Sequence, residues 1–157
     1  MTSRAIVLDA NILIRAVLGV KVSALIADHA AGVNFLAPDT AFQEVQEHLP
    51  AILSARGAAA EDLAAALRAL DALASVVAAV PEQSYDPSRV AALARIGRRD
   101  PYDWSVLACA LQLGCPIWTE DRDFFGVGVS VWTTATVGLY LSGEALDPAR
   151  PADRRAP

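Results

Sequence analysis

Four acidic residues stand at places where an enzyme could use them together. Asp9 ends the apolar run RAIVLD, Glu44 lies in a helical stretch, Asp103 follows a helix start signal, and Asp121 comes just after the apolar run CPIWT. Unpaired carboxylates repel one another, and no lysine lies near them in sequence, so divalent cations are their natural partners. Hard oxygen ligands favour Mg²⁺ or Mn²⁺ over Zn²⁺. One or two such ions can activate water and neutralise a phosphodiester, which predicts hydrolytic phosphoryl transfer.

Each acid also has a structural interpretation when it is considered alone. Asp103 favours a helix N-terminus, Glu44 can face solvent, and Asp121 can shape a turn. Asp9 is harder to explain in this way, because a carboxylate that ends an apolar strand must be hydrated, hydrogen-bonded or matched by a cation. We therefore expect Asp9 to anchor the site.

Other chemistries fit the sequence less well. The two histidines, His29 and His48, form no HExxH motif, which argues against zinc. The first strand leads into DANIL rather than a glycine-rich turn, and no GxxxxGK motif occurs, so nucleotide binding is disfavoured. A metal-binding regulatory domain of the receiver type would need a paired acid before Asp9 and a late lysine. The chain has Leu8 before Asp9 and only one lysine, Lys21.

Apolar runs that alternate with helical stretches position the acids. The pattern predicts an α/β domain with three α/β/α layers and a mainly parallel sheet of four to five strands. Because ligands bind beyond the carboxyl ends of parallel strands, Asp9 and Asp121 should meet at one sheet edge. We expect strands at 4–9, 33–37, 115–119 and 129–133, and helices at 11–19, 23–32, from 39 to a kink or end at Pro50, 58–80, 86–96, 101–114 and 134–141.

Composition and charge limit the class of protein. A chain of 157 residues with 54% hydrophobic content forms one ordinary domain, which we place at 1–143, followed by a tail at 144–157 predicted to be disordered. The net charge of −5 is opposite to that of proteins that hold nucleic acid by phosphate neutralisation alone. The two cysteines form no disulfide framework, and no signal peptide or membrane span is recognisable. We expect a cytoplasmic protein that does not contact membranes.

Four segments carry a family resemblance: IVLDANILI at 6–14, AFQEV with Glu44, DWSVLACAL from Asp103, and IWTEDRDFF from Ile117. In this order the chain resembles the PIN-domain nucleases, which include the toxins of VapC-type toxin-antitoxin pairs. Members of that family bind Mg²⁺ or Mn²⁺ through such acids and cleave RNA. The resemblance thus implies an RNA substrate and catalytic, metal-binding roles for Asp9, Glu44, Asp103 and Asp121, with Asn11 and Thr119 as supporting polar groups.

Several further roles stay open. Asp123 and Asp100 could each complete a second metal site. Otherwise Asp123 forms a turn and Asp100 caps the helix before Pro101, and for Asp100 the cap is the simpler explanation. Arg98, Arg99 and Arg122 are candidate RNA phosphate contacts, although each can equally be a solvated surface charge.

The resemblance also implies partners for the chain, namely a homodimer and a cognate antitoxin. Helix surfaces around Leu18, Phe42 and Leu49 could form the antitoxin's groove, with core packing as the simpler explanation. The alternatives are an RNA-processing PIN nuclease outside a toxin-antitoxin pair and a PIN-like scaffold without activity.

Overall fold

A parallel sheet forms the centre of the molecule, for which a computed structural model describes residues 3–144. Every strand pair is parallel, and the strand order is β3-β2-β1-β4-β5. This confirms the predicted α/β class and its parallel sheet. The strands are β1 (Arg4–Leu8), β2 (Val33–Pro38), β3 (Val77–Val80), β4 (Ile117–Trp118) and β5 (Val131–Trp132).

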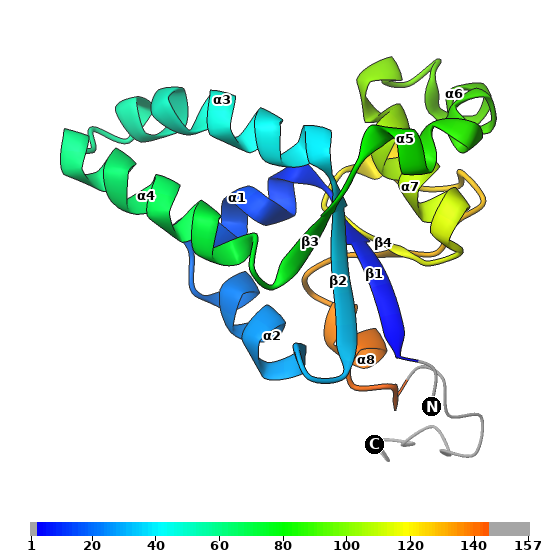
Figure 1. Cartoon of the computed structure of the whole chain (residues 1–157), viewed down its shortest axis with the longest axis horizontal. Helices are drawn as coiled ribbons and strands as arrows, with labels where there is room; N and C mark the ends of the chain where they lie inside the picture. Colours follow the sequence, from blue (N-terminus) through cyan, green and yellow to red (C-terminus); the bar gives the residue numbers. More distant parts are fainter. Residues whose placement is uncertain (1–2, 145–157) are drawn as a thin grey trace, which may run out of the picture.

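Helices cover both faces of the sheet and complete the three predicted layers. In Figure 1, α1 to α4 lie on one side of the strands and α5 to α7 on the other. Single turns of 3₁₀-helix at 86–88 and 101–103 precede α6 and α7, and a third lies at 122–124. The helices are α1 (Ala10–Leu18), α2 (Lys21–His29), α3 (Asp39–Ala55), α4 (Ala60–Leu73), α5 (Glu82–Tyr85), α6 (Arg89–Ile96), α7 (Trp104–Leu113) and α8 (Val137–Leu141).

The central strand β1 shows why the sheet needs apolar residues on both faces. Ile6 and Leu8 point into the cluster made with α1 to α4 and α8, whereas Val7 points into the cluster made with α6 and α7. All three side chains are fully buried. Alternate residues of a strand face opposite sides, so a central parallel strand must be apolar throughout. Asp9 directly follows the last residue of β1, so the requirement for apolar side chains along the strand no longer applies to it.

The predicted helix at 58–80 is wrong at its C-terminal end. Helix α4 stops at Leu73, and residues 77–80 form the edge strand β3 instead. Val77 pairs with Phe35 and Val80 with Pro38, and both valines are buried. The alanines of this stretch favour helix, but pairing with β2 and burial of the two β-branched residues outweigh that local preference.

Pro50 neither ends nor interrupts α3, which runs on to Ala55. A proline inside a helix removes one backbone hydrogen bond. Here the ring is exposed, while Val45, Leu49 and Leu53 are buried in the core on both sides of it. Their packing offsets the lost bond, and α3 therefore extends beyond the predicted boundary.

Within residues 3–144, no single helix is both long and apolar enough to cross a membrane. Helices α1 and α2 meet such a criterion only when taken together, and they are bent by 101° relative to one another. Of the tail predicted to be disordered, only Glu144 belongs to the described residues, and 145–157 lie outside them.

Candidate metal centre

Asp9 is held rigidly at the carboxyl end of β1, where it caps α1. Its Oδ1 accepts a hydrogen bond from the backbone N–H of Ala10 at 2.7 Å. Its Oδ2 accepts from Thr119 Oγ1 at 2.7 Å and from Asn11 Nδ2 at 3.0 Å. The side chains of Asn11 and Thr119 therefore fix one orientation of a carboxylate whose residue is only 6% exposed.

Thr119 also joins Asp9 to the second strand end. It follows β4, which pairs with β1, and its Oγ1 accepts a hydrogen bond from the N–H of Asp121 at 2.9 Å. Asp121 Oδ1 in turn accepts from the N–H of Asp123 at 2.9 Å. Asp121 thus caps the turn at 122–124 and lies beside Asp9 at the same sheet edge, as the parallel topology predicts.

A second group of acids centres on Asp103, at the start of α7. Carboxylate oxygens of Asp100, Asp103 and Asp123 lie within 4.8 Å of one another. Asp100 is the predicted cap, because its Oδ1 accepts from the N–H of Tyr102 at 2.9 Å, yet it also belongs to this group. Among the described residues Asp103 Oδ2 is buried and has no hydrogen-bond partner.

Glu44 reaches the same site from α3, on the other side of an open cleft. The cleft has a volume of about 540 Å³. Glu44 itself is exposed, and its Oε1 lies 3.9 Å from Nε2 of His48. The residues that line the cleft are Thr40, Glu44, His48, Asp100, Tyr102, Asp103, Trp104 and Ser105.

The acids perturb one another electrically. Burial, followed by the charges of Asp9, Asp100, Asp121 and Glu44, raises the pKa of Asp103 to about 8. Burial also raises the pKa of Asp9 to about 6, against the opposing effect of the hydrogen bonds from Thr119 and Ala10. The charges of Glu44 and Asp121 act on Asp9 in the same direction as burial. Asp9 and Asp103 are therefore harder to ionise than a free carboxyl group.

A divalent cation fits this arrangement. It would relieve the mutual repulsion and would bind the carboxylate oxygen of Asp103 that lacks a partner. The donors are hard oxygens drawn from several carboxylates, which is the set that Mg²⁺ and Mn²⁺ prefer. The residues present are thus suited to such an ion.

Comparisons with known proteins identify the family and the fold of the chain. Residues 7–142 match the protein family described as PIN domain. The chain belongs to the PIN-domain family. A chain of VapBC2 from Rickettsia felis, solved bound to a DNA fragment from their promoter, shares the fold of this PIN domain with a TM-score of 0.60 at 12% sequence identity. The likeness covers 82% of this chain and 98% of that chain. No curated protein matches the chain.

The three arginines predicted near the site of this PIN domain differ in their surroundings. Arg99 Nη1 donates to the backbone oxygens of Asp123, at 2.8 Å, and of Phe125. Arg99 therefore braces the turn that carries Asp123. Arg98 and Arg122 are exposed, and Arg122 lies in the same turn. Arg98 and Arg122 thus remain open to solvent at the edge of the site.

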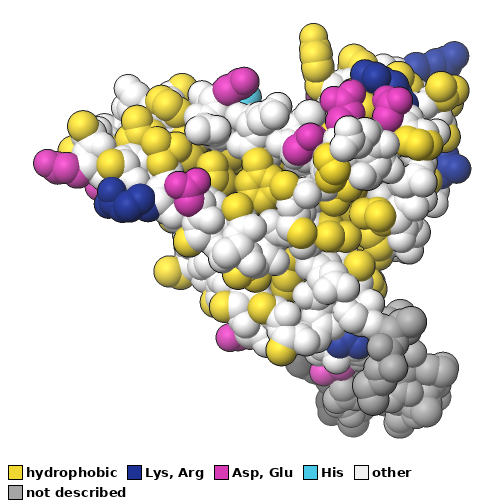
Figure 2. All heavy atoms as spheres, viewed as in Figure 1, with side chains coloured by type: hydrophobic (Ala, Val, Ile, Leu, Met, Phe, Trp, Pro, Cys, Tyr) yellow, Lys and Arg dark blue, Asp and Glu magenta, His cyan; other side chains and the backbone are white. Residues whose placement is uncertain are grey.

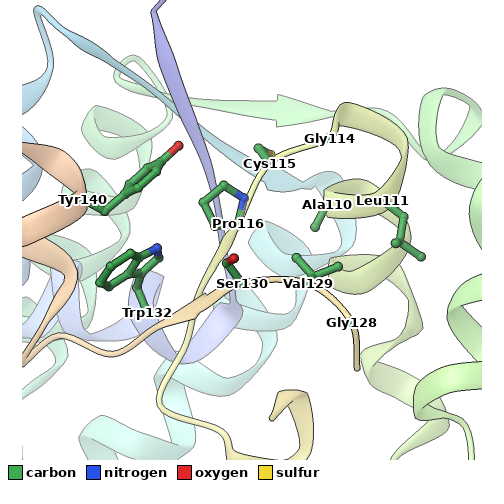
Figure 3. A pocket seen from close by; sticks show the side chains of 10 residues that line it. All are labelled: Ala110, Leu111, Gly114, Cys115, Pro116, Gly128, Val129, Ser130, Trp132 and Tyr140. Carbon is green, nitrogen blue, oxygen red and sulfur yellow. The ribbon is translucent and has the colours of Figure 1, made fainter. Parts of the chain in front are cut away.

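Another cavity of the PIN domain, of about 560 Å³, lies at the opposite end of the sheet. Figure 3 shows the rings of Trp132 and Tyr140 side by side, next to Pro116. Their ring centroids are 5.7 Å apart. The residues that line this cavity lie on α7 and α8, in the segments before β4 and β5, or, for Trp132, in β5 itself, and none is acidic. It therefore lacks the groups for metal-assisted hydrolysis.

Two residues of the site, Tyr102 and Glu120, were not predicted from the sequence, and Asp100 takes both of the positions that were left open for it. Asp100 joins the acidic group in addition to capping, and its spacing of three from Asp103 across Pro101 was the available signal. Tyr102 lines the cleft with 88% of its surface exposed. Glu120 Oε1 accepts from the N–H of Thr134 at 2.7 Å, a contact between two loops that no local pattern encodes.

Proposed function

We propose that this PIN domain is a divalent-metal-dependent endoribonuclease. The observation that carries the proposal is the buried oxygen of Asp103, which has no hydrogen-bond partner among the described residues although four other carboxylates act on it electrically. A folded protein tolerates such an arrangement when a bound cation compensates for it. Hydrolysis of a phosphodiester bond is the reaction that such a bound cation most directly supports.

The ligands in this proposal are Asp9, Glu44, Asp103, Asp121 and Asp123, with Asp100 added by its place in the cleft. When bound, Mg²⁺ or Mn²⁺ supplies positive charge against the phosphodiester and lowers the pKa of water. Asp9 is preorganised for this role, because Thr119 and Asn11 hold its Oδ2 before any ion arrives. Arg99 donates a hydrogen bond to the backbone oxygen of Asp123 and so holds the backbone of that residue in place.

Tyr102 gives the cleft a means of holding unpaired RNA. Its ring is exposed on the rim, while its backbone N–H is fixed by Asp100. Exposed aromatic rings stack on the bases of single-stranded RNA, and a duplex does not offer its bases in this way. We therefore propose single-stranded segments or loops of RNA as the substrate. We also propose the cytoplasm as the place where the protein acts.

We further propose that the protein is the toxin of a toxin-antitoxin pair. The support is its likeness in fold to a chain of the VapBC2 complex, together with the family membership. A cognate antitoxin would then be encoded next to this chain and would block the acidic cleft. An RNA-processing nuclease without an antitoxin is the alternative, and the homodimer implied by the family remains a prediction.

The test is cleavage of single-stranded RNA by the purified protein with Mg²⁺ or Mn²⁺ and with EDTA. Asp9→Asn and Asp103→Asn should abolish metal-dependent cleavage. Asp28→Asn is the matched control, because Asp28 is an exposed acid on α2 and should be dispensable. Equal cleavage by all three variants, or no cleavage of any RNA by the wild type, would refute the proposal. Co-purification with the product of a neighbouring small gene would separate the toxin from the processing enzyme.

A further inference from the structure

A groove with a cationic rim lies where α1 ends and α2 begins, away from the acidic cleft. It has a volume of about 310 Å³. In Figure 1 these two helices meet at a sharp bend. Arg56 is the residue that follows the end of α3. Ile14, Leu18 and Val22 give the groove an apolar floor, and Thr134 lines it from the segment after β5. We call it the α1–α2 groove.

Three cations line this groove: Arg15, Lys21 and Arg56. All three are exposed. Within the described residues, the ion pairs at 4.0 Å or less join His48 to Glu44 and Arg89 to Glu82 and Asp86, and none uses a groove cation. The gathering is unusual for a chain of net charge −5. On the face shown in Figure 2, by contrast, cations occur as separate patches among acidic and apolar side chains.

The α1–α2 groove is connected to the metal centre through Glu120. Arg15 lies one helical turn beyond Asn11 on α1, on the same side of the helix. Thr134, which lines the groove, donates its N–H to Glu120 Oε1 at 2.7 Å, and the N–H of Glu120 donates to Asn11 Oδ1 at 3.5 Å. Glu120 directly precedes Asp121 in the chain, so its contact with Thr134 joins the groove to the acidic site.

We propose that the α1–α2 groove binds the backbone phosphates of single-stranded RNA next to the bond that is cleaved. A cluster of carboxylates repels a polyanion, so an enzyme of this charge needs cations close to its site to hold RNA. Arginine offers a planar fork suited to phosphate, and an apolar floor accommodates unstacked bases. This inference rests on the proposed ribonuclease function and adds the place where its substrate is held.

An acidic peptide is the other occupant that the charge would admit. Continuity with the carboxylate site favours RNA, because a strand that crosses the metal centre must continue onto a neighbouring surface. The groove is such a surface, because Thr134 on its wall is hydrogen-bonded to Glu120, the residue before Asp121. The experiment must nevertheless separate the two occupants.

The test measures binding of a short fluorescent single-stranded RNA by the Asp103→Asn protein, which should not cleave it, as salt is increased. Replacing Arg15, Lys21 and Arg56 by glutamine should reduce the slope of log affinity against log salt by about 2, because each phosphate contact in a single strand contributes about 0.7. The affinity at 0.1 M salt should fall by about 10- to 100-fold. Arg68→Gln, at an exposed arginine on α4, is the matched control and should leave slope and affinity unchanged.

Each outcome decides between the claims. If the wild type cleaves RNA but the triple variant keeps its affinity and salt slope, the groove proposal is wrong and the ribonuclease stands. If the protein neither binds nor cleaves RNA, both proposals fail. If the triple variant binds RNA normally but no longer binds poly-glutamate, the groove is a protein docking site and the proposal is overturned. The single variants Arg15→Gln and Arg56→Gln, checked for an unchanged melting temperature, guard against a folding defect.

Discussion

Replacing Asp103 by asparagine should stabilise the protein in the absence of metal while it destroys activity. Asparagine keeps the shape of the side chain but cannot ionise. The carboxyl of Asp103 has a pKa of about 8 in the folded protein, against an ordinary value of 3.8, because burial and four neighbouring acids oppose its charge. Between these two pH values the folded state binds more protons at Asp103 than the unfolded state does. The free energy of unfolding therefore falls as pH rises through this window, and the loss levels off above it.

The size of the effect follows from the same pKa change. Each tenfold change in an acid dissociation constant corresponds to about 1.4 kcal/mol. Asp103 is only half-buried, so solvent screening reduces the full value, and we expect a gain of about 1–3 kcal/mol from Asp103→Asn at pH 8. For a domain of this size the melting temperature should rise by about 3–10 °C.

The assay is thermal unfolding of wild type, Asp103→Asn and the control Asp28→Asn at pH 5 and pH 8, in EDTA and in excess Mn²⁺. In EDTA the advantage of Asp103→Asn should be larger at pH 8 than at pH 5. Excess Mn²⁺ should stabilise the wild type more than the variant, because a ligand that binds only the folded state adds stability. An advantage that is absent in EDTA, or that shrinks as pH rises, would refute the electrostatic reasoning.

Three further perturbations test other parts of the site and the fold. Thr119→Val removes the hydroxyl that donates to Asp9 and accepts from Asp121 N–H, so the rate of RNA cleavage should fall about 10- to 100-fold. Thr119→Ser keeps the hydroxyl and should restore the rate. An unchanged rate in Thr119→Val would show that Thr119 does not support the site. Tyr102→Ala should raise KM for single-stranded RNA about 5- to 100-fold, whereas Tyr102→Trp should not, and equal KM values would exclude stacking. Leu49→Ala, at a fully buried position of α3, should lower the free energy of unfolding by about 2–5 kcal/mol in urea titrations, and a loss well below that range would mean that α3 packs loosely.

The sequence predicts the sheet edge well because its logic is local. Asp9 and Thr119 each follow or end a short apolar run, which predicts that both lie at the carboxyl ends of strands. The pairing of β1 with β4, which brings these residues into contact, joins distant segments that no local pattern connects. The contact between Asn11 and Asp9 follows from their spacing at a helix start. These parts of the site lie at strand ends and helix caps, which can be recognised from the types of residue in the sequence.

The elements and contacts that were missed depend on long-range packing. β3 exists because β2 offers an edge for Val77 and Val80, and nothing within the alanine-rich stretch signals that partner. The approach of Asp100, Asp103 and Asp123 depends on how the turn at 122–124 packs near the start of α7, with Arg99 bonded to the turn's backbone. The α1–α2 groove likewise needs the bend between two helices and the end of a third. Such features come from tertiary structure rather than from local preference.

In the proposed function, the carboxylates around Asp9 and Asp103 hold a divalent ion for RNA hydrolysis. Single-turnover cleavage of a single-stranded RNA, measured as Mn²⁺ is titrated into metal-free protein, tests it most directly. Without metal we expect no cleavage. In the wild type and in Asp28→Asn the rate should rise to saturation with Mn²⁺. In Asp103→Asn the rate should fall by more than the about 10- to 100-fold expected for a residue that only supports a metal ligand. Cleavage that persists in EDTA, or an Asp103→Asn protein that responds to Mn²⁺ as the wild type does, would contradict it.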